Sequence, residues 1–128
     1  MEWLLKTEPS DYSFQDLVRD KETTWSGVTN ATAVKNIRAM KKGDRIVVYH
    51  TGGVRAAVGL ATVASLPRPD PKNPKSALVD VTAGKALKVS VPLEALKANP
   101  LFSSSPLVTI GRLSVVPLTA EQYAFLSR

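Results

Sequence analysis

Bulky hydrophobic residues form strand-like segments in three parts of the first half of the chain. Residues 2–8 are the first of them, and Pro9 ends it because proline has no N–H with which to continue a sheet. The stretches 45–50 and 56–65 are β-branched and apolar, and the glycine-containing stretch 51–53 separates them. Two such segments around a short turn predict a β-hairpin.

Apolar residues at helical spacing predict short helices between and after these strands. In "YSFQDLVRD", Ser13 with Asp16 three residues later has the pattern of a capping box. A second helix is predicted at 30–40, and a short third one in "PLEALKAN", which begins with Pro92. The last helix is predicted to start at Thr119, because a glutamine three residues later completes another capping box.

The second half of the chain has a less regular pattern. Residues 66–76 contain four prolines and are predicted to form an exposed loop outside the sheet, because each proline removes a ladder donor. Residues 77–91 predict one or two strands with an interruption at 83–84. A loop is expected at 99–106, and the segments "LVTI" and "RLSVVPL" after it are expected to be extended.

These elements together predict the fold class. Strands outnumber the short and scattered helices, which indicates an α+β domain built around a small barrel or a strongly bent sheet. A doubly wound parallel sheet would need a regular alternation of strands and helices, and the chain lacks it. The chain has 128 residues without repeats or a long linker, so residues 1–128 are expected to form a single domain.

Composition narrows the class of protein further. The chain is 44% hydrophobic, contains no cysteine and has no apolar run near the roughly 20 residues that span a membrane. We therefore expect no membrane contact, no disulfide and no thiolate metal site. The N-terminus lacks the pattern of a signal peptide, so a cytoplasmic location is expected.

Charge is distributed unevenly along the chain, whose formal net charge is +6. Residues 1–24 hold six acidic and three basic residues, so the segment 25–128 carries 14 basic and five acidic residues. A basic excess of this size attracts polyanions such as nucleic acid. A soluble basic protein without such a partner fits the charge equally well.

The sequence contains few signals of catalysis. His50 is the only histidine, and no G-x-S-x-G motif accompanies it, so a nucleophilic triad is not indicated. A single histidine without cysteine does not supply a zinc site, and "TGGVRAAVG" lacks the lysine of a phosphate-binding loop. No metal or other cofactor is expected.

Three polar residues stand together at the end of the first predicted strand, in "WLLKTEPSDYS". Lys6 and Glu8 should share one face of the strand while Thr7 points to the other. Taken alone, Lys6 and Glu8 are most simply a surface ion pair, worth about 0–1 kcal/mol. They can also belong to a catalytic group or to the polar wall of a ligand pocket.

Other candidate residues surround the second predicted helix and the hairpin. Trp25 is predicted in a loop between two helices, where it is either a core plug or a stacking surface for a planar base. Asn30 is most simply an N-cap, although its amide can also pair with a base edge. Tyr49 and His50 end a strand beside a glycine turn, where side chains can line a cleft.

Two long segments, "WLLKTEPSDYSFQDL" and then "WSGVTNATAVKNIRAMKKGDRIVVYHTGGVRAAVGLATV", together resemble the EVE domain family of the PUA-like superfamily. That family's outline runs W-x-x-K-[ST]-E-P, W-x-G-V-x-N, a basic helix ending in A-M-x-x-G-D, and a strand ending in Y-H. The later "LVDV", "PLEALKANP" and "GRLSVVPLTAEQY" are similar to its second half. The resemblance covers nearly the whole chain and implies a PUA-like mixed β pseudo-barrel with short peripheral helices.

The resemblance also implies a function. It implies a non-catalytic module, expected to be a monomer, that takes a modified base of DNA or RNA, most simply a modified cytosine, into an aromatic and polar pocket. The positions of this chain that match the family's motifs are Trp3, Lys6, Thr7, Glu8, Trp25, Gly27, Val28, Asn30, Tyr49 and His50. The cations expected to contact phosphates outside the pocket are Lys35, Arg38, Lys41, Lys42 and Arg55.

Two departures from the family pattern leave other functions open. Thr29 stands where the family commonly has arginine, and Ala31 stands where an aromatic residue often follows the asparagine. These losses fit an RNA-associated barrel with a vestigial pocket. A second alternative is a hydrolase acting on a modified nucleoside, because ASCH-type relatives resemble enzymes that use lysine, threonine and glutamate.

Overall fold

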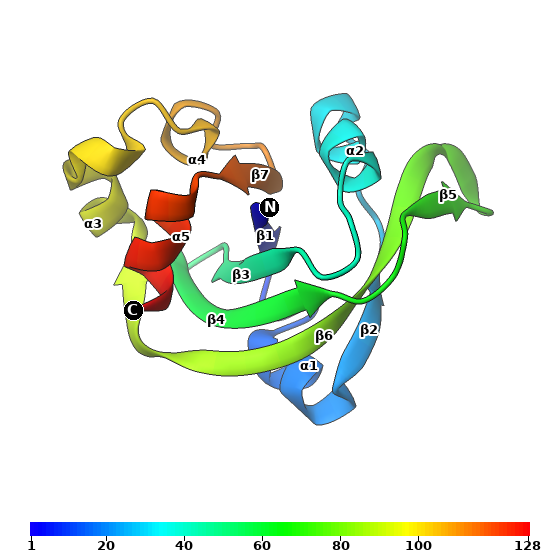
Figure 1. Cartoon of the computed structure of the whole chain (residues 1–128), viewed down its shortest axis with the longest axis horizontal. Helices are drawn as coiled ribbons and strands as arrows, with labels where there is room; N and C mark the ends of the chain where they lie inside the picture. Colours follow the sequence, from blue (N-terminus) through cyan, green and yellow to red (C-terminus); the bar gives the residue numbers. More distant parts are fainter.

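The computed structural model describes all 128 residues, and its strands form one seven-stranded mixed sheet (Figure 1). The order across the sheet is β2-β6-β4-β3-β1-β7, and β5 pairs with β6 beside this path. The strands are β1 (Glu2–Thr7), β2 (Glu22–Trp25), β3 (Arg45–His50), β4 (Ala56–Val63), β5 (Arg68–Asp70), β6 (Asn73–Pro92) and β7 (Val115–Leu118).

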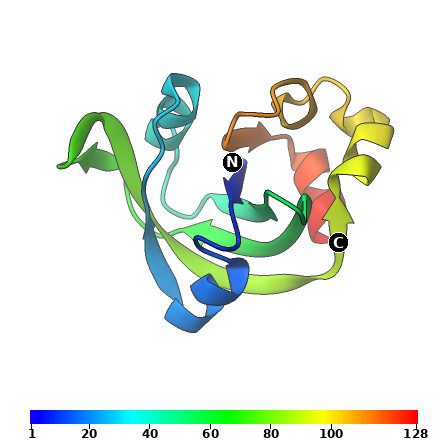
Figure 2. The ribbon, with the colours of Figure 1, turned by 180° about the vertical axis from the view of Figure 1, so that it is seen from behind.

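Short helices surround the sheet, as Figures 1 and 2 show from opposite sides. They are α1 (Phe14–Asp20), α2 (Ala31–Arg38), α3 (Leu93–Ala98), the 3-10 helix η1 (Pro100–Phe102), α4 (Pro106–Thr109) and α5 (Ala120–Ser127). None of these helices is long and apolar enough to cross a membrane.

The sheet curls into a barrel that stays open along one side. The long strand β6 sweeps across the molecule in one arc, and β4, β3 and β1 follow it inward (Figure 1). β1 runs parallel to β3 and antiparallel to β7. The end strands β2 and β7 do not pair with each other, so we call the gap between them the seam. Helix α2 packs against both β6 and β7 at one end of the seam, where the Asn36 side-chain amide donates to the Val115 carbonyl at 2.8 Å.

The interior of this barrel is a single hydrophobic cluster. In β1 the consecutive residues Trp3, Leu4 and Leu5 are all buried, because the strand lies between two others and is covered on both faces. The indole N–H of Trp3 donates to the Asp44 carboxylate at 3.0 Å, so this polar atom is satisfied within the core. The first half of β1 is therefore part of the core on both faces of the strand.

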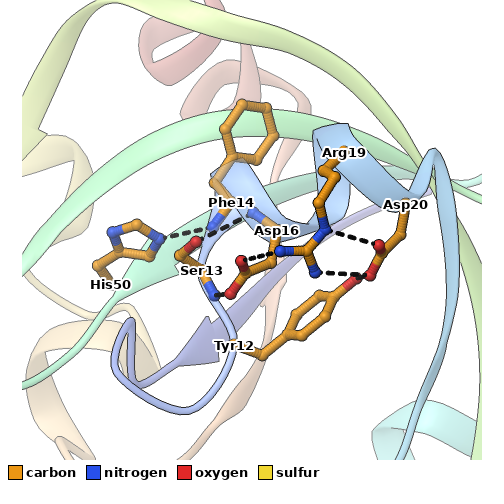
Figure 3. Close-up of polar contacts among 7 residues, drawn as sticks. All are labelled: Tyr12, Ser13, Phe14, Asp16, Arg19, Asp20 and His50. Atoms are coloured by element: carbon orange, nitrogen blue, oxygen red, sulfur yellow. Dashed lines mark hydrogen bonds and ion pairs between the residues drawn. The ribbon is translucent and has the colours of Figure 1, made fainter.

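Several sequence predictions are confirmed. The first strand, the β3–β4 hairpin and the second helix occur where they were expected. Both capping boxes are present, with Ser13 and Asp16 at the start of α1 (Figure 3) and Thr119 at the start of α5. Asn30 caps α2 as predicted.

Two predictions about proline-rich and interrupted segments are corrected. Residues 68–70 join the sheet as β5 instead of forming a free loop; β5 pairs only with β6, and an edge strand tolerates proline because one side of it needs no donors. Residues 77–91 lie in one continuous strand, and the expected interruption near Gly84 is a register shift opposite β4. A Cβ on Gly84 would lie 2.8 Å from the Leu60 carbonyl oxygen, so the strands approach too closely there for a side chain.

Two further segments differ from the prediction. The segment "LVTI" belongs largely to helix α4, because the Ser105 hydroxyl accepts from the Leu107 N–H and Pro106 starts the first turn. Trp25 ends strand β2 and pairs with Val79, whereas the sequence pattern placed it in a loop. Strand β2 has only four residues between two helices, which is too short for a clear periodic signal.

Candidate functional site

A polar cavity of about 670 Å³ occupies the seam of the barrel. One wall is β2 with the loop 26–30 that follows it, and the opposite wall is Arg112 and Ser114 just before β7. The end of β1 and the turn after it form the floor between these walls. Edge strands leave alternate backbone N–H and C=O groups unpaired, so this part of the sheet offers backbone as well as side-chain hydrogen-bonding groups.

Trp25 is partly a core residue and partly a wall of this cavity. Its side chain belongs to the hydrophobic cluster and is only 8% exposed, yet it lines the cavity. Its indole N–H makes no hydrogen bond within the protein, and every fully buried side-chain nitrogen or oxygen does have a partner. The indole N–H is therefore not fully buried. Trp25 is therefore a core residue that also forms part of the cavity wall.

The loop after Trp25 is held in place from the neighbouring strand. The buried hydroxyl of Ser76 on β6 donates to the Val28 carbonyl at 2.5 Å. One residue before Trp25, the Thr24 hydroxyl donates to Asp80, which also pairs with Arg68 at 3.0 Å. These contacts fix both ends of the segment that carries the indole, so the cavity wall is preorganised.

The side-chain oxygen of Asn30 is used in a helix cap, while its side-chain NH₂ group is free. Its side-chain oxygen accepts from the Ala33 N–H at 3.0 Å and so caps α2. The capping bond requires an acceptor at that position, which leaves the side-chain NH₂ group facing away from it. This NH₂ group donates to no protein acceptor, and Asn30 lines the cavity. The NH₂ group is therefore a free hydrogen-bond donor on a residue that lines the cavity.

The polar trio at the end of β1 lies together in the cavity wall, contrary to the expectation of alternating faces. β1 ends at Thr7, so Glu8 belongs to the following turn and no longer obeys the strand alternation. Lys6 and Glu8 form no ion pair. The Lys6 ammonium donates to the Gly111 carbonyl at 3.0 Å, and Glu8 accepts from the backbone and hydroxyl of Ser10.

The protonation states of the trio follow from these contacts. Partial burial of the Lys6 ammonium lowers its pKa below the ordinary lysine value. Hydrogen bonds from the Ser10 hydroxyl and backbone lower the pKa of Glu8, so it stays an acceptor. The Thr7 hydroxyl donates to the Tyr12 carbonyl at 2.7 Å, which leaves its oxygen lone pairs as acceptors. The trio thus supplies one cation and two acceptors.

Several lining residues were not among the pocket residues predicted from the sequence. These are Asp11, Tyr12, Thr23, Thr24, Ser26, Thr29, Arg112 and Ser114. Arg112 is the second cation of the cavity and forms no ion pair with a carboxylate. It is far from the other lining residues in sequence, and only the order of strands in the sheet brings it opposite Trp25. No local pattern in the sequence indicates that proximity.

Three predicted pocket residues lie elsewhere. Trp3 is in the core at the opposite end of β1, with its N–H bound to Asp44. Tyr49 faces a different cavity, and His50 is 5% exposed and accepts from the Phe14 N–H at 2.9 Å (Figure 3). The strand end was correctly expected to lie near a cleft, but the pairing of β3 between β1 and β4 turns these side chains away from the seam.

The predicted phosphate-contacting residues divide into two groups. Lys35 and Arg38 lie on α2, which begins at the cavity rim, and Lys41 and Lys42 lie in the turn after it. All four are exposed and form no ion pair. Arg55 is separate from them, because it lies on the β3–β4 turn. None of these five cations lines the seam cavity.

His50 makes the stability of the fold depend on pH. Burial lowers the pKa of His50 below its ordinary value of 6.5, and the unprotonated Nε2 accepts from the Phe14 N–H. The unfolded chain therefore binds a proton more readily than the folded one, and the stabilisation is present above about pH 6.5 and lost as the pH falls below it. Urea unfolding should show a decrease of at most about 1.4 kcal/mol per pH unit in this range.

The matched variant for this prediction is His50→Gln. Its side-chain oxygen can accept from the same N–H, but it does not titrate. The free energy of unfolding of this variant should therefore be flatter between pH 6.5 and 5 than that of the wild type. Equal pH dependence in the two proteins would contradict the role given to His50.

The open mixed barrel with its seam cavity is a PUA-like fold. The sequence profile of the EVE domain matches residues 1–128, and the chain belongs to the EVE domain family. Thymocyte nuclear protein 1 of Mus musculus is 34% identical, over 97% of this chain and 71% of the mouse protein.

Two solved structures extend this comparison. The NMR structure of Rpa0253 from Rhodopseudomonas palustris has a TM-score of 0.92 and 37% identity, covering 98% of this chain and 90% of that one. Human THYN1 protein, crystallised in complex with DNA that contains 5-methylcytosine, has a TM-score of 0.88 and 28% identity, covering 97% and 94%.

Proposed function

We propose that this chain is a non-catalytic module that binds DNA carrying a modified cytosine and holds the modified base in the seam cavity. The observation that carries the proposal is the pairing of an indole with free donors and acceptors in one cavity. A relative, human THYN1 protein, has been crystallised with DNA that contains 5-methylcytosine, and this supports the choice of ligand.

The chemistry of the cavity matches the needs of an extruded base. A base taken out of a duplex loses stacking and pairing, which costs a few kcal/mol, and the site must return that energy. Stacking on an aromatic ring contributes about 1–3 kcal/mol, and Trp25 supplies that ring. The pairing edge of cytosine has one amino donor and two acceptors; Glu8 or Asp11 can accept from the amine, and the NH₂ group of Asn30 can donate.

The charge of the chain supports a nucleic-acid partner. The exposed cations on α2 and in the turn after it begin at the rim where the base would enter. Such cations neutralise phosphates and make binding sensitive to salt. The proposal applies to the chain as a monomer, and RNA is the competing nucleic acid.

The test of this proposal is a titration of fluorescent oligonucleotides of one sequence that contain 5-methylcytosine, 5-hydroxymethylcytosine or cytosine. The wild type should bind one modified oligonucleotide more tightly than the plain one. Asn30→Ser should keep the helix cap and the folding midpoint, because serine caps about as well as asparagine. It should nevertheless weaken binding roughly tenfold, because the donor to the base edge is lost. Equal affinity for all three oligonucleotides would refute the proposal.

A specific observation also favours a second function, hydrolysis of a modified nucleoside. Lys6, Thr7 and Glu8 line the same cavity, and burial lowers the pKa of Lys6 towards that of a usable base. Against it, each of the three already has a hydrogen-bond partner in the protein. Turnover of acylated cytidines by the wild type, lost in Lys6→Met, would establish the hydrolase; no turnover would eliminate it.

A further inference from the structure

A second cavity, of about 290 Å³, lies next to the seam cavity and shares Lys6 with it. It is bounded by the end of β3, the β3–β4 turn, the start of α3 and helix α4. Its polar lining consists of Lys6, Tyr49, Thr51, Arg55 and Lys97. The lining contains three cations and two hydroxyls but no carboxylate, so its chemistry suits an anion.

Tyr49 presents an unused hydroxyl to this cavity. The residue is only 3% exposed, so it is a built part of the wall and not a mobile surface group. Its hydroxyl forms no hydrogen bond with the protein, whereas every fully buried side-chain nitrogen or oxygen has a partner. The hydroxyl is therefore partly accessible, and Tyr49 lines the cavity. A donor without a protein partner at a cavity wall is free to bind a ligand or water.

The three cations keep most of their donors free. None of Lys6, Arg55 and Lys97 forms an ion pair. Lys6 uses one donor for the Gly111 carbonyl and lies 5.6 Å from the centre of the Tyr49 ring. Arg55 uses only its Nε, which donates to the Gly52 carbonyl at 3.2 Å.

Two carboxylates border the region without neutralising it. Glu8 lies near Gly52, but both of its partners belong to Ser10. Glu94 lines an adjoining hollow together with Arg55 and Lys97 and pairs with neither. The excess of positive charge in the cavity is therefore retained.

The two cavities are adjacent along the chain as well as in space. Gly111 lines the second cavity and Arg112 lines the seam cavity. Likewise, the Thr51 N–H donates to the Thr7 carbonyl at 2.9 Å, and these two residues line different cavities. A nucleotide with its base in the seam cavity would thus have its sugar and phosphate beside Lys6.

From this arrangement we infer that the second cavity is a phosphate subsite, which binds the phosphodiester next to the modified nucleotide through Lys6, Tyr49, Arg55 and Lys97. The inference rests on the proposed function, because it assumes a nucleic-acid strand whose base enters the seam cavity. It adds a fixed position for the backbone, which sets the direction in which the strand leaves the pocket.

The first test is the salt dependence of binding in Arg55→Gly/Lys97→Gln. Arg55 has a φ of 49°, which glycine adopts without strain, so the change to glycine removes the charge and the exposed bond to the Gly52 carbonyl but does not strain the backbone of the turn. The slope of log affinity against log salt should fall in magnitude by about 1.5, as expected for two lost phosphate contacts. The matched control, Lys85→Gln/Lys88→Gln, removes two exposed charges on β6 that line neither cavity and should change the slope less.

The second test replaces single phosphates by neutral methylphosphonates along the oligonucleotide. One linkage beside the modified nucleotide should weaken wild-type binding roughly tenfold when neutralised. The same replacement should have little effect on Arg55→Gly/Lys97→Gln, because the partner charges are already absent. Tyr49→Phe should weaken binding to the native linkage by several-fold while leaving the folding midpoint unchanged, since the hydroxyl loses no protein contact.

These measurements separate the subsite from the proposed function. The salt-dependence and the methylphosphonate measurements are each made with plain and with 5-methylcytosine oligonucleotides. If the protein shows no preference for the modified base but still responds to neutralisation of one particular linkage, the base pocket is refuted and the subsite is retained. Equal slopes in the cavity and control variants, or a uniform response at every linkage, would overturn the subsite even if base preference is strong.

Discussion

Trp25→Leu is expected to weaken binding to a 5-methylcytosine oligonucleotide by roughly tenfold to a hundredfold. Leucine keeps an apolar side chain towards the core but removes the π-face and the free indole N–H. Stacking of one base on an aromatic ring contributes about 1–3 kcal/mol, which corresponds to this range. The affinity should be measured by fluorescence anisotropy, with thermal unfolding recorded in parallel.

The chain contains a natural control, because its other tryptophan lies outside the cavity. Trp3→Phe removes the donor to Asp44 and should cost about 1–3 kcal/mol of folding free energy, with little change in affinity while the protein is folded. It also leaves Trp25 as the only tryptophan, so quenching of its fluorescence on titration would report directly on the cavity. Wild-type affinity in Trp25→Leu, or no fluorescence change in Trp3→Phe, would contradict stacking on this indole.

Gly59→Ala is expected to destabilise the fold by about 3 kcal/mol. A Cβ at this position would lie 2.3 Å from the Phe14 ring, which is buried. The Phe14 backbone is held by its N–H bond to His50 at the start of α1 (Figure 3), so the buried ring can avoid the Cβ only by rotating into the packed core. Overpacking in a dense core typically costs about 1–3 kcal/mol, and a restrained neighbour places this case at the upper end.

Urea unfolding of two further variants tests the cause of this effect. Gly53→Ala adds a Cβ that meets nothing within 4 Å, so it should change stability by less than about 0.5 kcal/mol. Gly59→Ala combined with Phe14→Leu should be less destabilised than the two single changes predict together, because the smaller side chain makes room. Additive effects of the two changes would refute the steric explanation.

The parts of the fold that could be predicted from the sequence are those with local causes. The capping boxes at Ser13 and Thr119 and the cap at Asn30 depend on residues three positions apart, and all three are present. The prediction of an extended conformation for "LVTI" was wrong, because its β-branched composition suggested a strand while the serine and proline before it start a helix. The prediction that the prolines in 66–76 exclude this segment from the sheet was wrong, because an edge strand needs only half of its backbone donors.

The candidate site depends on contacts that the sequence pattern does not encode. The polar trio, Trp25 and Asn30 were selected through the family's motifs, and the structure places them around one cavity. The same motifs also contain Trp3 and His50, whose partners are Asp44 and the Phe14 backbone. A motif records that a residue matters without distinguishing a ligand contact from a structural bond.

The seam has a consequence for how such domains diverge. The hydrophobic cluster of 29 residues draws on the strands and on the helices around them, whereas most of the cavity wall lies on β2, the loop after it and the segment just before β7. Apart from Trp25, Val28 and Tyr12, the residues of this wall contribute no side chain to the cluster, so their exchange removes no core packing. Ligand preference can therefore change among relatives that keep the same architecture.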